Sequence, residues 1–193
     1  MDITKIPKQI DEIFDILSSG QFICSNDNRT IKLYDIIYEN YDTLYEYFSA
    51  INFILEKGDE FYYFSRKNES KVDLERKLEA ACKWIDILDF FRTYDDAFVP
   101  GYSFTIYEIV VKIKVDAVLK NKIDGLRNVL KLDDKTPYDE VINKMVKNLC
   151  DDGFISIENE ISKTYKILTS FKYLEELVTN INIPEEVQNE IPE

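Results

Sequence analysis

The chain has 193 residues, of which 45% are hydrophobic and 13% aromatic, so it can fold around one core or two smaller ones. Its formal net charge is −13, which argues against a surface that neutralises many phosphates and makes a protein a better expected partner than DNA or an anionic membrane. Histidine is absent, which excludes His-dependent triads, HExxH metallopeptidases and zinc sites that use His.

The three cysteines, Cys24, Cys82 and Cys150, are far apart and form neither a CxxC pair nor a four-thiolate zinc site. We expect them to be reduced and buried or half-buried, as apolar residues of a cytosolic protein. Residues 1–12 lack the apolar core of a secretory signal, and no charge-free run reaches the roughly 20 residues that span a bilayer. The sequence therefore predicts a soluble cytoplasmic protein without a cofactor.

The first elements in chain order are helices. Residues 7–19 place apolar side chains at three- and four-residue spacing, and Gly20 is suited to the end of such a helix. Residues 30–39 and 41–51 have the same period, with Asn40 as the turn between them. The sequence thus predicts one amphipathic helix followed by a helix pair.

A hairpin is predicted directly after the helix pair. Residues 51–66, INFILEKGDEFYYFSR, contain two short apolar stretches joined at residues 57–59, and Gly58 lies where a positive φ is useful. A helix, a helix pair and a hairpin follow one another in the same order in a winged-helix domain.

The second half repeats this order. Helical patterns cover 71–93, 105–113, 115–130 and 137–150, followed by a second hairpin within 151–170 and a helix over 171–181. Thr136-Pro137 with Glu140 predicts the start of the fourth of these elements. We therefore predict a mainly α fold with short β-hairpins (α+β), built as tandem winged-helix domains.

The predicted domain boundaries follow from these elements. An N-terminal winged-helix domain is expected over 1–68, and a linking helix with a C-terminal winged-helix domain over 69–183. Residues 184–193 are acidic and bounded by prolines, so we expect them to form a flexible tail.

Three pairs of adjacent acids, Asp95-Asp96, Asp133-Asp134 and Asp151-Asp152, are candidates for metal ligands or for a general acid and base. Each pair falls where a predicted helix begins or ends, which is a usual position for caps and turns. We expect no catalytic or metal-binding role for them.

Tyrosines are concentrated in the predicted helix pair. Tyr34, Tyr38, Tyr41, Tyr45 and Phe48 follow spacings of 4, 3, 4 and 3, which would align them on one face if the helix continued through position 40. One interpretation is a core stripe. The other is a protein interface, because tyrosine combines apolar area with a hydroxyl and is enriched at binding hot spots.

Aromatic residues also occupy both faces of the second strand of the first hairpin. One face can pack on the helices, and we expect the other, with Tyr62 and Phe64, to be covered by a second protein chain. The hairpin tip carries Glu56, Asp59 and Glu60 against Lys57 alone, and would repel a phosphate backbone.

One segment of the chain is basic. It contains Lys112, Lys114, Lys120, Lys122, Arg127 and Lys131. A solvated helix face is the simpler interpretation of this segment. The alternative is a supplementary DNA contact, made when a larger complex holds DNA nearby.

Four stretches carry a resemblance to a known family: GQFICS at 20–25, LYDIIYENYDTLYEYFSAINFILEKGDEFYYFSR at 33–66, LERKLEAACKWIDILDFF at 74–91, and DDGFISIEN followed by YKILTSFKYLEELV at 165–178. In the order and length of these stretches, the chain resembles the MukE/MksE-like (kite) subunits of bacterial condensin-type SMC complexes, including those of the related Wadjet defence systems.

The resemblance implies a non-enzymatic protein of two winged-helix domains that forms a homodimer and binds a kleisin-like protein (MukF/MksF-like). Through that complex it would associate with an SMC-like ATPase (MukB/MksB-like) and with the nucleoid, and its DNA contact would be weak or indirect. The alternative functions are a winged-helix transcription regulator that binds DNA through 112–131 and, third, an enzyme built on paired carboxylates.

Overall fold

A computed structural model gives the structure of residues 6–66 and 71–180, and of residues 71–81 and 180 only the backbone is described. The expected boundary between residues 68 and 69 and the expected tail over 184–193 therefore lie outside the described residues. The chain is mainly helical, with small antiparallel sheets, and the predicted α+β class is confirmed.

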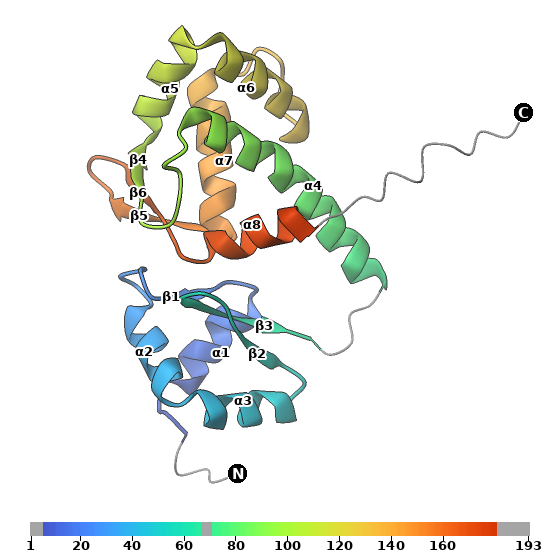
Figure 1. Cartoon of the computed structure of the whole chain (residues 1–193), viewed down its shortest axis with the longest axis vertical. Helices are drawn as coiled ribbons and strands as arrows, with labels where there is room; N and C mark the ends of the chain where they lie inside the picture. The colour runs from blue at the N-terminus through green and yellow to red at the C-terminus, as the bar shows by residue number, and fades with distance from the viewer. Residues whose placement is uncertain (1–5, 67–70, 181–193) are drawn as a thin grey trace, which may run out of the picture.

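The N-terminal half contains three helices and a three-stranded sheet (Figure 1). Its elements are α1 (Ile10–Ser18), β1 (Ile23–Cys24), α2 (Ile31–Glu39), α3 (Tyr41–Ala50), β2 (Ile54–Lys57) and β3 (Phe61–Ser65). The sheet has the antiparallel order β1-β3-β2, in which Ile23 lies opposite Tyr62 and Leu55 opposite Phe64. The predicted helices and hairpin are confirmed, although α1 begins at Ile10, three residues after the predicted start.

The C-terminal half has the same sheet order with more helices around it. Its elements are α4 (Lys71–Tyr94), β4 (Ser103–Thr105), α5 (Ile106–Val115), α6 (Ala117–Val129), α7 (Tyr138–Asp151), β5 (Ile155–Asn159), β6 (Thr164–Ile167) and α8 (Phe171–Asn180). The strands are ordered β4-β6-β5, so in both halves a short strand before the helices pairs with the last strand of the hairpin. The sequence did not predict β4.

Two helix starts in this half differ in their chemistry. The hydroxyl of Thr105 accepts from the backbone N–H of Glu108, and the Glu108 carboxylate accepts from the N–H of Thr105 at 2.8 Å, so a capping box begins α5. The predicted start beside Thr136 is in the right place, but α7 has no side-chain cap, because Pro137 occupies the cap position.

The glycines at two turns act differently. Gly20 follows α1 with a φ of +86°, as expected for a residue that ends a helix. Gly58 does not have a positive φ, so that part of the prediction is wrong. A Cβ at position 58 would lie 2.1 Å from Cζ of Phe61, so the glycine leaves room for the Phe61 ring.

Each half has its own core. In the N-terminal core, Leu17, Ile37 and Phe48 are fully buried behind the sheet. In the C-terminal core, side chains from α4, α5, α6 and α7 meet around Phe91, which stacks on Phe98 at a centroid distance of 4.2 Å. Burial of these apolar surfaces is the main favourable contribution to the folding of each half.

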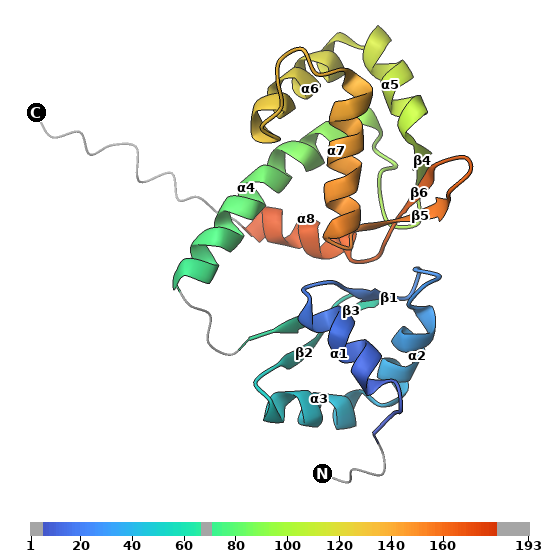
Figure 2. The ribbon, with the colours of Figure 1, turned by 180° about the vertical axis from the view of Figure 1, so that it is seen from behind.

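A third apolar cluster joins the halves where α8 crosses above the N-terminal sheet (Figures 1 and 2). Phe22, in the segment leading into β1, lies 5.4 Å from the ring of Phe154 and 5.3 Å from that of Tyr173. Tyr173 in turn lies 4.9 Å from Tyr63 of β3. We call this the junction cluster; it also buries Cys24, Phe61 and Leu168.

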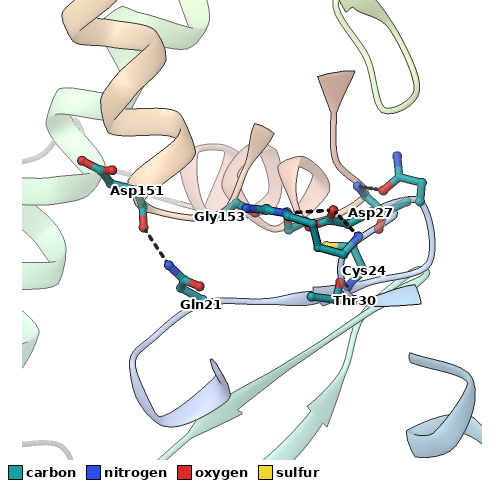
Figure 3. Close-up of polar contacts among 10 residues, drawn as sticks. Gln21, Cys24, Asp27, Thr30, Asp151 and Gly153 are labelled. Atoms are coloured by element: carbon teal, nitrogen blue, oxygen red, sulfur yellow. Dashed lines mark hydrogen bonds and ion pairs between the residues drawn. The ribbon is translucent and has the colours of Figure 1, made fainter. Parts of the chain in front are cut away.

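Polar groups complete the junction. Asn26 donates through Nδ2 to the carbonyl of Ile167 at 3.0 Å and accepts at Oδ1 from the N–H of Thr169 at 2.9 Å. The hydroxyl of Thr169 donates to the carbonyl of Glu60 at 2.7 Å. Figure 3 shows a further contact, from the Gln21 side chain to the carbonyl of Asp151 at the end of α7. Both halves of the chain thus supply apolar and polar partners to this contact.

Candidate protein-interaction surface

The predicted tyrosine stripe is divided by the break at Asn40, which ends α2 and precedes α3. Tyr38 is 64% exposed and Tyr45 is 40% exposed, whereas Phe48 is fully buried. The two interpretations of the stripe therefore apply to different residues: Phe48 belongs to the core, and Tyr38 and Tyr45 lie on the surface. We call Tyr38 and Tyr45, with the acids around them, the tyrosine surface.

Tyr34 and Tyr41 lie between core and surface. Their rings are half-buried and lie 5.1 and 6.0 Å from the ring of Tyr62, and the Tyr41 hydroxyl donates to the carbonyl of Leu55 at 2.9 Å. Burial raises the pKa of both phenols. These two residues support the tyrosine surface from below rather than form its outer face.

The expected outer position of Tyr62 is wrong. Tyr62 is fully buried in the N-terminal core, where burial raises its pKa to about 12. Phe64, two residues later and therefore on the same face of β3, is half-buried against Phe48 at 4.8 Å and Phe53 at 5.1 Å. Tyr62 is therefore not available to a partner, whereas the half-buried Phe64 stays a predicted interface residue.

The opposite face of β3 points away from the N-terminal core. Phe61 and Tyr63 point from it into the junction cluster, where they meet Tyr173 of α8. The expected cover, a second protein chain, is thus replaced by the C-terminal half of the same chain. The hairpin tip is held there as well, because Lys172 forms an ion pair with Asp59.

The tyrosine surface is acidic. Glu39, Asp42 and Glu46 are exposed on the same two helices, and Nζ of Lys57 lies 5.5 Å from the centre of the Tyr38 ring. Exposed tyrosines with this setting are suited to a protein partner, because their rings bury apolar area while the hydroxyls stay hydrogen-bonded. The same charges disfavour DNA.

Three of the six candidate DNA contacts have partners within the chain. Lys112 donates to the carbonyl of Tyr94, and Lys122 pairs with Asp89. Arg127 is buried: it donates to the carbonyl of Thr136 at 2.9 Å and pairs with Asp124. Lys114, Lys120 and Lys131 are exposed and have no ion-pair partner among the described residues.

The adjacent acids serve as turn and cap residues where the structure describes their bonds. Asp95 accepts from the N–H of Ala97 at 2.9 Å, and Asp133 accepts from the N–H of Lys135 at 2.8 Å. Burial raises the pKa of Asp152, and the nearby Lys83 opposes the shift. Among the residues that the structure describes, no group of three or more Cys, Asp or Glu side chains is placed to hold a metal ion.

The cysteines are free, and only part of the prediction for them is confirmed. Cys24 is buried and Cys150 half-buried, but Cys82 is exposed on α4, so its expected burial is wrong. Burial raises the pKa of Cys24 and raises that of Cys150 to about 11. No helix within 6–66 or 71–180 is both long and apolar enough to cross a membrane.

With this geometry established, comparison with known proteins identifies the family. A family model described as condensin complex protein MksE matches residues 8–178. The chain belongs to the MksE family. No curated protein matches it. As an MksE-family protein the chain is an accessory subunit of a condensin-type SMC complex and associates with other subunits of that complex, which confirms the resemblance found in the sequence.

One surface of this MksE-family chain was missed from the sequence. Tyr107, Val111, Val115 and Val118 are exposed at the corner between α5 and α6, and Tyr107 and Val115 are 76% and 84% exposed. The four-residue spacing of Tyr107, Val111 and Val115 was a detectable signal, since it places them on one side of α5.

Proposed function

We propose that this MksE-family chain is a non-catalytic accessory subunit that binds a kleisin-like protein (MukF/MksF-like) as a homodimer. The family match over residues 8–178 carries this proposal, because it covers both halves of the chain. The chain joins an SMC-like ATPase (MukB/MksB-like) through that complex, and ATP hydrolysis belongs to the ATPase. Its work is chromosome organisation or defence against plasmids, in the cytoplasm and at the nucleoid.

Each half of the chain is proposed to be a winged-helix domain. The N-terminal half, assigned to 1–68, has the order helix, strand, two helices and hairpin, and its first strand pairs with the last strand of the hairpin. The C-terminal half, assigned to 69–183, repeats this order with α6 inserted between α5 and α7 and α8 added after the hairpin. The wing of the first domain packs on the second domain, so it is not free to follow a DNA backbone.

The tyrosine surface is the proposed contact with the kleisin-like protein. Tyr38 and Tyr45 supply exposed aromatic area, and the ring of Tyr41, at 6.0 Å from that of Tyr45, connects this surface to the core. The ring of Tyr34 packs on the buried Tyr62 at 5.1 Å. The acids beside them favour a partner segment that contains Lys or Arg. Direct DNA binding is weak in this proposal, since only Lys114, Lys120 and Lys131 of the basic segment remain unpaired among the described residues.

Co-purification tests the proposal. The chain is co-expressed with a tagged kleisin-like subunit, as wild type and as Tyr38→Ser/Tyr45→Ser, with Ile161→Ser as control because Ile161 is also an exposed apolar residue, on the second hairpin. Wild type and control are expected to co-purify, and the double variant to be lost from the complex while keeping its circular dichroism spectrum. If the wild-type chain, correctly folded, does not associate at micromolar concentration, the proposed function is wrong.

A further inference from the structure

Helix α5 is apolar on two sides. Ile109 and Ile113 are fully buried in the C-terminal core, whereas Tyr107, Val111 and Val115 form an exposed stripe along the other side. Val118, in the first turn of α6 and 57% exposed, extends the stripe around the corner. Figures 1 and 2 show that α5 and α6 occupy the part of the C-terminal half away from the N-terminal half. We call these four residues the α5 stripe.

Neither folding nor helix formation accounts for the α5 stripe. Valine is a weaker helix former than Lys, Glu or Ala because the preceding turn restricts its branched side chain. At Val115, 84% exposed, little apolar surface is buried in return. A helix with apolar residues on both sides is normally covered on both. Contiguous exposed apolar residues with polar surroundings mark interaction sites.

The charges beside the stripe indicate what kind of partner fits it. Lys114 and Lys120 are exposed and have no ion-pair partner within the described part of the chain. Two acids lie in the same stretch and keep their charges while they cap helices: Glu108 in the capping box of α5, and Asp116 accepting from the N–H of Val118 at 2.8 Å. With Lys112, three lysines of this stretch outnumber them. Residues 107–120 therefore combine an apolar stripe with a net charge of +1, from three lysines and two acids, in a chain whose net charge is −13.

An apolar stripe with lysines beside it disfavours two other partners, a second copy of the chain and DNA. A symmetric dimer through the α5 stripe would bring the lysines of both copies into one interface, where like charges oppose each other. DNA would place its phosphates over valine side chains, whereas phosphate binding depends on clustered Lys and Arg. A protein segment that alternates apolar and acidic residues satisfies both the stripe and its lysines.

We propose that the α5 stripe binds an acidic, apolar segment of another subunit of the condensin-type complex. The inference rests on the proposed function, since it takes that subunit as the partner. It adds a second, basic contact to the acidic tyrosine surface, so that the chain holds segments of opposite charge on its two halves.

The first experiment identifies the occupant. Tyr107, 76% exposed, is replaced by the photo-crosslinker benzoylphenylalanine in the full chain, and the complex with the kleisin-like subunit and the SMC-like ATPase is irradiated. The cross-linked peptide is expected to belong to one of these two proteins and to contain apolar residues with a net negative charge. A cross-link to residues 181–193, a cross-link to a second copy of the chain, or none in a complex that has formed, would overturn the inference.

The second experiment measures the contribution of the stripe. Val115→Glu is expected to weaken binding in the complex by roughly tenfold or more, the size of effect typical of a buried apolar anchor. Lys114→Glu/Lys120→Glu should weaken it and reduce its dependence on salt. Ile161→Glu, which also places Glu on a fully exposed apolar position, is the control and should bind as wild type does.

The outcomes separate the two proposals. If the wild-type chain binds its partners and Val115→Glu binds equally well, the α5 stripe is not a contact and the proposed function stands. If the folded wild-type chain binds neither partner, the proposed function fails, and the assignment of the stripe fails with it.

Discussion

The side-chain amide of Asn26 accepts a hydrogen bond from the N–H of Thr169 at 2.9 Å, across 143 positions of the sequence. Through Nδ2 the same amide donates to the carbonyl of Ile167, so it bonds one backbone group at the end of β6 and one in the segment that leads to α8. Asn26 thereby acts toward this segment as the backbone of a neighbouring strand would. It therefore links the two halves through two hydrogen bonds from one side chain.

Asn26→Ala is expected to lower the free energy of unfolding by about 1–3 kcal/mol, because the N–H of Thr169 loses its partner and the carbonyl of Ile167 keeps only its bond from the N–H of Gly101. Asn143→Ala is the matched control, since in the part of the chain that the structure describes the Asn143 amide bonds within α7, to the carbonyl of Asp139. The control should change stability by less than about 0.5 kcal/mol. Urea denaturation followed by circular dichroism measures both.

The single tryptophan, Trp84, lies in the C-terminal core, so its fluorescence reports the unfolding of the C-terminal half. Comparison with the circular dichroism of the whole chain then tests whether the two halves unfold together. In the wild type, the urea transition of Trp84 fluorescence is expected to coincide with that of the circular dichroism signal, as for one cooperative unit. In Asn26→Ala the two transitions should move apart. Coincident transitions in the variant would show that the apolar junction cluster couples the halves without the amide.

Tyr62→Phe is expected to leave stability unchanged or to raise it by up to about 2 kcal/mol. The Tyr62 hydroxyl is buried without a hydrogen-bond partner among the described residues, so its removal ends a desolvation cost. Tyr41→Phe is the matched control, because it removes a hydroxyl that bonds the carbonyl of Leu55, and it should cost about 0.5–1.5 kcal/mol. A loss of stability in Tyr62→Phe would contradict this account of the core.

The protein should lose stability in alkali between about pH 10 and pH 12. Burial raises the pKa of Tyr62, Tyr63 and Tyr94 from 10.0 to about 12. The folded state holds these phenol protons more tightly than the unfolded state does. Their contribution to the free energy of unfolding is therefore fully present below the ordinary tyrosine pKa, and it is lost as pH rises through the raised pKa of the folded state. Urea midpoints at pH 8 and pH 11 measure the loss, which should be smaller in Tyr62→Phe.

Gly58→Ala and Gly125→Ala are expected to act in opposite directions. At position 58 a Cβ would lie 2.1 Å from Cζ of Phe61, and displacing that buried ring should cost about 1–3 kcal/mol. At position 125, within α6, a Cβ would meet nothing within 4 Å, so alanine should add up to about 1 kcal/mol through helix propensity. Thermal unfolding of the two variants measures the contrast.

The helices and hairpins could be predicted because their signals are local. The spacing of apolar residues in α1, α2 and α7 defines a helical face, and the hairpins follow from short apolar stretches beside a turn. The strand β4 could not be found in this way, since Ser103–Thr105 is too short to show an alternating pattern. The capping box of Thr105 and Glu108 was visible in the sequence as a Thr-x-x-Glu pattern and was overlooked.

The faces of β3 could not be assigned from the sequence, for a physical reason. Alternation in a strand shows that Tyr62 and Phe64 share one face and Phe61 and Tyr63 the other, but it does not show what lies over each face. That is decided by α8, more than a hundred residues later, through Tyr173. The partners of Lys112 and Lys122 were hidden in the same way, because Tyr94 and Asp89 belong to α4.

Light scattering coupled to size-exclusion chromatography tests the central claim most directly, with the chain alone and with a kleisin-like subunit. The account predicts about twice the mass of 22.8 kDa for the chain alone, and a single peak with a larger mass, containing both proteins, for the mixture. A monomer that elutes separately from a folded kleisin-like subunit at micromolar concentration would contradict it.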